Sequence, residues 1–263
     1  MPARGPRRLP VAATRSPRSA RIRLAHSINR FRQINWSVPV AVGLVLFVAG
    51  IPRQVRDALL NGILAQPYVM VMLVVFGLLS VSLLWSAGQR LDAWVFLFIN
   101  FRGRHPAWLD WIMLGLTQLG SALAPAAVTI AAFLANDSDL AYEVMLGSLT
   151  LVLTVELAKA AFRRARPFVR LTQTRIVGYR ARGRSFPSGH TSQAFYLAAV
   201  LLEHFHLGFG AILLVYGLAV VVAVTRMYIG AHYPRDVLAG AILGSAWGLL
   251  GVVMDANFAL KIG

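Results

Sequence analysis

Seven apolar stretches, separated by short polar or charged segments, dominate this chain of 263 residues. A bilayer core is about 30 Å thick and is crossed by about 20 helical residues, so six of the stretches are long enough, or nearly so, to span a membrane. The first is shorter and ends at Pro52, so it can span, dip into the membrane or lie at the interface. The sequence therefore predicts an all-α polytopic transmembrane helical bundle of six core spans, with room for a short extra N-terminal hydrophobic helix. The stretches are 36–51, 64–87, 107–135, 140–162, 188–205, 207–227 and 236–255.

The overall composition supports a membrane protein. Hydrophobic residues make up 57% of the chain and charged residues only 14%, whereas soluble domains carry about a quarter charged residues. Cysteine is absent, which excludes disulfides, thiolate nucleophiles and cysteine-ligated metals. The net charge of +16 comes almost wholly from arginine. Because these arginines lie between apolar stretches, the expected partners are membrane lipids and an anionic substrate, and not nucleic acid.

The chain divides into three parts. Residues 1–34 hold nine arginines and no acidic residue, and they are predicted to form a basic, disordered tail. A transit peptide has a similar composition, but a cytoplasmic tail is the preferred interpretation. Residues 35–63 form a short hydrophobic or interfacial segment, and residues 64–263 form one membrane domain. Within it, RLDAWVFLFINFRGRHPAW alternates aromatic with charged residues, which is typical of a segment at the membrane surface.

Three clusters of polar residues lie at the ends of four of the apolar stretches. The loop 164–186 stays on one side of the membrane, and the stretches 188–205 and 207–227 form a hairpin that returns the chain to that side. All the flanking residues are therefore expected at a single membrane face. They are Lys159, Arg166, Ser188, Gly189, His190, Arg226, His232 and Asp236.

Each of these clusters also has an ordinary structural explanation. Basic residues at helix ends commonly anchor the interface, and this interpretation is preferred for Arg163 and Arg164. A Ser-Gly pair before a helix is usually a cap, and Pro234 suits the first turn of a helix. Anchoring does not, however, explain why lysine, arginines, serine, two histidines and an aspartate meet around one helix start.

That combination suits a phosphate ester. A helix N-terminus binds anions through its free N–H groups and its dipole. Gly189 allows the backbone to approach an oxygen closely, and Ser188 adds a hydroxyl donor. Arg166 and Arg226 each offer a planar fork for two oxygens, and Lys159 adds a point charge.

The two histidines then divide the chemistry. His232 is the predicted nucleophile, because Asp236 lies four residues on and can hold its other ring nitrogen. His190, at the phosphate-binding helix start, is the predicted general acid. We expect a metal-independent reaction without a cofactor, because five cationic side chains would repel a metal ion. These side chains are Lys159, Arg163, Arg164, Arg166 and Arg226.

Three motifs resemble those of the type 2 phosphatidic acid phosphatase (PAP2) superfamily, which includes undecaprenyl-diphosphate phosphatases and vanadium haloperoxidases. KAAFRRARP is Lys-x6-Arg-Pro, PSGH follows, and TRMYIGAHYPRD contains Arg-x5-His-x3-Asp. Residues 91–121 also look like the amino-terminal half of the family. One departure is Thr225, where the family usually has serine; the hydroxyl is retained. The membrane-embedded character of the chain disfavours the haloperoxidase branch.

The resemblance implies the same roles for the same residues. It implies that His232 forms a phosphohistidine, that His190 is the acid and that Asp236 supports His232. It also implies an active site on the extracytoplasmic face of the cell membrane. If the first stretch spans, the site is instead cytoplasmic, which the positive-inside rule prefers. The residues implied to hold phosphate are Lys159, Arg166, Ser188, Gly189 and Arg226.

The substrate is expected to be a lipid phosphate or diphosphate. Five arginines in 168–186 favour a diphosphate, such as undecaprenyl diphosphate or a related isoprenyl diphosphate, although a solvated basic loop beside anionic lipid would have the same composition. Phosphatidic acid, phosphatidylglycerophosphate and phosphotransfer to another lipid remain alternatives. A non-catalytic phospholipid transporter would place ionisable residues near the midplane. The main acid inside a span, Glu156, lies one turn before Lys159 and is its expected partner. The sequence does not indicate the oligomeric state.

Overall fold

The computed structural model describes residues 66–101 and 106–262, together with positions 50, 53, 57, 60 and 64. The predicted tail 1–34 lies outside the described residues, as does nearly all of 35–63 with its first apolar stretch. Every described element is helical, which confirms the all-α prediction. The elements are α4 (Pro67–Ser82), α5 (Ser86–Phe101), α6 (Ala107–Leu116), the 3-10 helix η1 (Thr117–Gly120), α7 (Leu123–Leu134), α8 (Ser138–Phe162), α9 (Pro167–Arg170), α10 (Gly189–His204), α11 (Phe209–Tyr228) and α12 (Pro234–Ile262).

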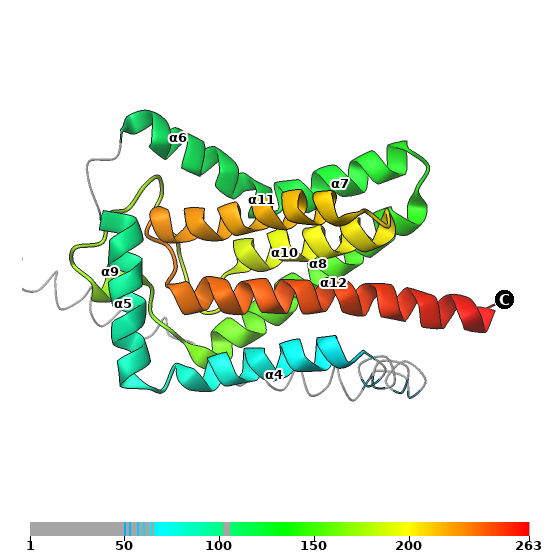
Figure 1. Ribbon diagram of the computed structural model, residues 1–263, viewed down its shortest axis with the longest axis horizontal. Coiled ribbons are helices and arrows are strands. Elements are labelled where there is room, and N and C mark those ends of the chain that lie inside the picture. The colour runs from blue at the N-terminus through cyan, green and yellow to red at the C-terminus, as the bar shows by residue number, and fades with distance from the viewer. Residues whose placement is uncertain are drawn as a thin grey trace, which may run out of the picture. The chain divides into compact units, whose positions relative to one another are not determined.

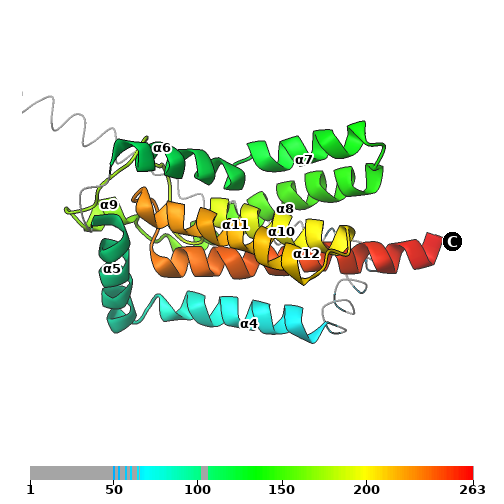
Figure 2. The same cartoon turned by 45° about the horizontal axis from the view of Figure 1, so that its top comes forward.

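Five of the helices correspond to predicted apolar stretches and run along a common direction. These are α4, α8, α10, α11 and α12, and α5 crosses them at a steep angle (Figures 1 and 2). The chain bends by 97° between α4 and α5. This turn agrees with the expectation that the aromatic and charged segment after α4 does not continue the span.

Two helical segments are long and apolar enough to cross a membrane on their own, Ser138–Arg170 and Phe209–Tyr228. Two bent pairs, α4 with α5 and α6–η1 with α7, raise the number to four if each pair counts as one span. The predicted count of six is thus not reached by length and composition among the described residues. The helix α10 shows why, because it has only 16 residues and carries His190, Gln193 and Glu203.

The predicted stretch 107–135 is broken rather than continuous. The segments before and after Gly120 are inclined by 55°, and the one turn of 3-10 helix, η1, lies at the break. A Cβ atom on Gly120 would lie 2.3 Å from the carbonyl oxygen of His190. Only glycine allows this close approach. The break therefore brings η1 against the first turn of α10.

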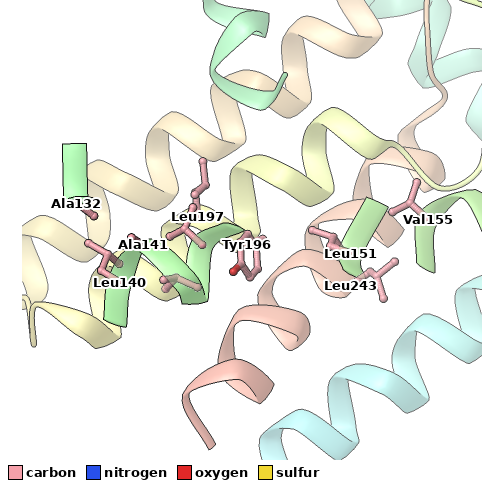
Figure 3. Close-up of a cluster of buried hydrophobic side chains, with 10 residues drawn as sticks. Ala132, Leu140, Ala141, Leu151, Val155, Tyr196, Leu197 and Leu243 are labelled. Carbon is pink, nitrogen blue, oxygen red and sulfur yellow. The ribbon is translucent and has the colours of Figure 1, made fainter. Parts of the chain in front are cut away.

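The helix α10 lies at the centre of the bundle, where it packs against α8, α11, α12 and η1. The largest hydrophobic cluster surrounds its residue Tyr196, with Leu151 and Val155 of α8 and Leu243 of α12 (Figure 3). The Tyr196 hydroxyl donates a hydrogen bond of 2.7 Å to the carbonyl of Glu143. This cluster fixes how α8, α10 and α12 are arranged.

A row of glycines on α12 allows it to lie directly against α10. Gly240, Gly244 and Gly248 recur every fourth residue, so they share one helix face. A Cβ atom on Gly244 would lie 2.1 Å from the carbonyl oxygen of Ser192. Small residues at such spacing permit close helix contact in membrane proteins. The packing holds the starts of α10 and α12 side by side, and Ser188 N–H donates to the Asp236 carbonyl at 2.9 Å.

Candidate active site

The predicted site residues come from five places in the fold that meet at one end of the bundle (Figure 1). Lys159 lies in the last turn of α8, and Arg166 immediately precedes α9. Ser188 is the N-cap residue of α10, and Arg226 lies in the last turn of α11. His232 lies in the turn before α12. The hairpin of α10 and α11 produces this arrangement, as the sequence predicts.

The imidazole of His232 is held at both nitrogens. Its Nδ1 lies 2.7 Å from the carbonyl oxygen of Ser185, and its Nε2 lies 3.2 Å from Nη1 of Arg166. A carbonyl only accepts and a guanidinium only donates, so Nδ1 carries the proton and Nε2 presents its lone pair. This is the tautomer that a nucleophilic Nε2 requires.

Burial keeps His232 neutral. The side chain is almost wholly buried, and this desolvation lowers the pKa of His232 to about 3, with the positive charges of Arg166 and Arg226 lowering it further. Asp236 opposes the shift without reversing it. The free protein therefore holds His232 as neutral imidazole at any pH near 7.

Asp236 faces the ring nitrogen of His232 that the sequence analysis assigned to it, but it makes no hydrogen bond there. Its Oδ2 is 3.7 Å from His232 Nδ1, beyond hydrogen-bond distance, and the Ser185 carbonyl lies nearer. Oδ2 instead accepts hydrogen bonds from the Ser185 hydroxyl and from the N–H of Tyr233, at 2.8 Å for the latter. The carboxylate orders the turn and the Ser185 segment, so its support of His232 is indirect.

Arg166 is fixed by backbone carbonyls on two sides of the site. Its Nε and Nη2 donate to the carbonyls of Gly183 and Arg182, at 3.2 and 2.8 Å, and its Nη1 donates to Ala231 at 3.0 Å. These contacts leave the guanidinium edge directed at His232. Arg166, predicted to hold phosphate, thus lies beside the predicted nucleophile.

Arg226 is positioned by a residue that sequence reasoning missed. Its Nη1 donates to the hydroxyl of Thr117 at 2.8 Å, and both side chains are buried. Its Nε is buried without a hydrogen-bond partner among the described residues. An unpaired buried donor is costly, and an anion beside it would satisfy it. Thr117 gave no sequence signal, because it lies in η1, 109 residues before Arg226.

We predict that Thr117→Val lowers kcat/KM for phosphate release by about tenfold, because losing a hydrogen bond to a charged group costs about 1.5 kcal/mol or more. Steady-state kinetics in detergent would measure the effect. Thr154→Val is the matched control, since that hydroxyl bonds only to a carbonyl of its own helix. Equal kcat/KM values for the two variants would contradict the role assigned to Thr117.

The first turn of α10 carries Ser188, Gly189 and His190. The Ser188 hydroxyl makes no side-chain cap bond and pairs with the Thr191 hydroxyl at 2.9 Å, so the simple cap interpretation does not hold. A Cβ atom on Gly189 would lie 3.8 Å from Nζ of Lys159, which places the ammonium beside this turn. Glu156 pairs with that ammonium at 2.7 Å, as the sequence predicts.

An apolar cavity of about 500 Å³ opens from this turn. Lys159, Gly189 and His190 line one end, and the rest is lined mainly by aliphatic residues of α7 and α8, including Ile130 and Val152. A smaller pocket of about 20 Å³ lies between His190 and Arg226. His190 thus borders both of these spaces.

Arg164 corrects a prediction. The sequence suggested an interface anchor, but the Arg164 side chain is buried and pairs with Asp92 and, at 2.6 Å, with Asp236. The interpretation failed because Asp92 lies 72 residues earlier, in a segment read as interfacial. Arg163 is exposed, which is compatible with anchoring.

The loop arginines do not act as one group. Arg175 forms an ion pair with Asp110 of α6, so its charge is already balanced, whereas Arg182 and Arg184 are exposed. Only some of the five loop arginines, such as Arg182 and Arg184, are therefore available to bind a second phosphate. No cluster of three or more His, Asp or Glu side chains with metal-binding geometry occurs within the described ranges.

Comparisons with known proteins agree on one family. Residues 140–259 match the family model of the PAP2 superfamily. A lipid A 1-phosphatase from Rhizobium etli is 35% identical over 41% of this chain, which spans about half (47%) of that relative's length. An undecaprenyl-diphosphatase from Sulfolobus acidocaldarius is 25% identical over 74% of this chain and 94% of its own length.

The fold has a solved counterpart. A transmembrane PAP2-type phosphatidylglycerolphosphate phosphatase from Bacillus subtilis superposes with a TM-score of 0.60. The superposition covers 74% of this chain and 97% of that one, at 23% identity. At this identity the likeness concerns the fold alone.

Proposed function

Because residues 140–259 match the model of the PAP2 superfamily, we propose that the protein is an integral membrane phosphatase that hydrolyses a lipid phosphate or diphosphate through a phosphohistidine. One observation carries the proposal. Neutral His232 directs an Nε2 lone pair at a buried arginine fork, beside the N-terminus of α10. A nucleophile, an anion site and an apolar cavity therefore adjoin one another.

In the first step, the Nε2 lone pair of His232 attacks phosphorus and forms a P–N bond, and the bond from phosphorus to the lipid oxygen breaks. His190 donates a proton to the departing oxygen. Arg166, Arg226 and Lys159 stabilise the charge on the remaining phosphoryl oxygens. The lipid leaves as an alcohol, or as a monophosphate when the substrate is a diphosphate.

In the second step, water attacks the phosphorus of the phosphohistidine. His190, now neutral, accepts a proton from that water, so the same residue serves first as acid and then as base. The P–N bond breaks, inorganic phosphate leaves and His232 recovers its lone pair. The Ser185 carbonyl stabilises the cationic imidazole of the intermediate through the Nδ1 proton.

For the substrate, we propose undecaprenyl diphosphate or a related isoprenyl diphosphate. The undecaprenyl-diphosphatase relative is matched over nearly its whole length, which favours this class over lipid A phosphates. The apolar cavity beside Lys159 suits a hydrocarbon chain, and exposed Arg182 and Arg184 are available to a second phosphate. Phosphatidic acid and phosphatidylglycerophosphate are the alternatives.

We place the protein in the cell membrane with six spans and the site at the extracytoplasmic surface. The helices α4 and α12, the broken segment α6–η1–α7 and the short α10 would complete the count alongside the two unbroken spans. In this arrangement α5 lies along the membrane surface beside the site, since the chain turns by 97° at its start.

The test measures phosphate release by detergent-purified protein from undecaprenyl diphosphate, phosphatidic acid, phosphatidylglycerophosphate and lipid A 1-phosphate, with EDTA present. We expect release to resist EDTA, because the site is lined by cationic side chains, and to be fastest with undecaprenyl diphosphate. A faster reaction with another lipid would replace the proposed substrate. If the phosphate of a labelled substrate appears on a second lipid, the reaction is phosphotransfer. If folded protein reacts with none of the lipids, the result favours a transporter.

A further inference from the structure

A buried cluster of charges links the surface helix α5 to the turn that carries His232. Asp92 of α5 accepts hydrogen bonds from Arg164 and from Nε of Arg235, at 2.7 Å for the latter. Arg164 donates through its other nitrogen, Nη1, to Oδ1 of Asp236 at 2.6 Å. Asp92, Arg164 and Asp236 are each more than 90% buried. One guanidinium thus bridges two carboxylates from helices far apart in the chain.

The cluster continues to the imidazole through Ser185. The Ser185 hydroxyl donates to Asp236, its N–H donates to the Arg164 carbonyl at 2.8 Å, and its carbonyl lies 2.7 Å from His232 Nδ1. The hydroxyl and the N–H of Ser185 are therefore both held by members of the cluster. Because the Ser185 carbonyl is the group that orients His232, anything that displaces Ser185 also displaces the nucleophile.

From this geometry we propose that Asp92 and Arg164 are positioning residues for His232, acting through Asp236 and Ser185. The inference rests on the proposed function. Arg164 lies over the ring of Tyr233, 4.4 Å from its centroid, so it also holds the residue next to His232. The two carboxylates balance the charges of Arg164 and Arg235, although Nε of Arg164 and Nη2 of Arg235 have no hydrogen-bond partner among the described residues.

A purely structural role would predict a different result. If the cluster only tied α5 to the bundle, weakening it would lower the melting temperature and would leave the turnover of the folded protein unchanged. If it positions His232, the folded protein should bind substrate normally and react slowly. A displacement of about 1 Å at a reacting group can lower a rate by about 100-fold.

The experiment compares Asp92→Asn and Arg164→Lys with the wild type on undecaprenyl diphosphate in detergent. We expect kcat to fall by about 10- to 100-fold, with KM within about twofold of the wild-type value. Base-quenched reactions with ³²P-labelled substrate should show the same fall in the rate of phosphohistidine formation. Asp92→Glu, which keeps the charge, should recover part of kcat.

The matched control is Asp137→Asn, which removes a partner of His204 at the other end of α8 and α10. It tests the loss of an inter-helix ion pair that does not touch the site, and its kcat should equal the wild-type value. If Asp92→Asn does not fold, Arg164→Lys and Asp92→Glu carry the comparison.

The outcomes separate this inference from the proposed function. A wild type that releases phosphate, with folded variants of unchanged kcat, would overturn the positioning role and leave the phosphatase intact. An inactive wild type would instead overturn the proposed function. A raised KM with unchanged kcat would also contradict the inference, because it would place Arg164 and Asp92 in substrate binding.

Discussion

His232→Ala is expected to lower phosphate release by at least about 1000-fold, the largest catalytic effect that we predict. The variant removes the atom that attacks phosphorus, and in enzymes that act through a covalent intermediate the loss of the nucleophile leaves only the contribution of the binding groups. The measurement combines steady-state phosphate release with trapping of acid-labile, base-stable ³²P on the protein. Wild type should incorporate label and the variant should not.

His206→Asn is the control for this experiment. His206 is exposed in the turn between α10 and α11 and has a positive φ of 49°, which asparagine adopts readily. Its activity should match the wild type. Label remaining on His232→Ala would show that another residue is the nucleophile, and the assignment of His232 would have to be abandoned.

Gly244→Val is expected to prevent accumulation of folded protein. Even the first atom of the new side chain would lie 2.1 Å from the carbonyl oxygen of Ser192, and that oxygen belongs to a backbone that cannot move without shifting α10. The helices α10 and α12 would separate, and the packing of the starts of both helices would be lost. Size-exclusion chromatography in detergent and thermal melting would measure the yield and stability of the variant.

Gly217→Val on α11 provides the comparison, because a Cβ atom there meets nothing within 4 Å and the position is exposed. It introduces the same residue into a helix without a steric clash. We expect yield and melting temperature close to those of the wild type. If both variants fold equally well, the close packing of α12 on α10 is not as described.

The sequence allowed most of the helices to be located because lipid-spanning segments leave a local signal, the length of an apolar run. The helices α8 and α11 begin and end within about two residues of the predicted stretches. The break at Gly120 was not predictable in this way, because its cause is a contact with His190 far along the chain. Helix length is a local property, whereas helix continuity here depends on tertiary packing.

The eight predicted site residues fall in three short motifs, and spacing within a motif was sufficient to find them. The residues that support them do not lie in motifs. Thr117, Ser185 and Asp92 form hydrogen bonds with residues between 47 and 143 positions away, and some of these bonds involve backbone atoms. Neither kind of contact leaves a pattern in one sequence. The same limit explains why Arg164 was interpreted as an anchor.

The contact between Arg166 and Nε2 of His232 has a consequence for how the reaction begins. In the free protein the lone pair of Nε2 already accepts a hydrogen bond, so the nucleophile is occupied. A guanidinium binds phosphate oxygens more strongly than a neutral imidazole, because both partners are then charged. In the proposed mechanism, an arriving phosphate would draw Arg166 onto its own oxygens and free Nε2 in the same event. Binding of the substrate phosphate would then itself make the His232 lone pair available for attack.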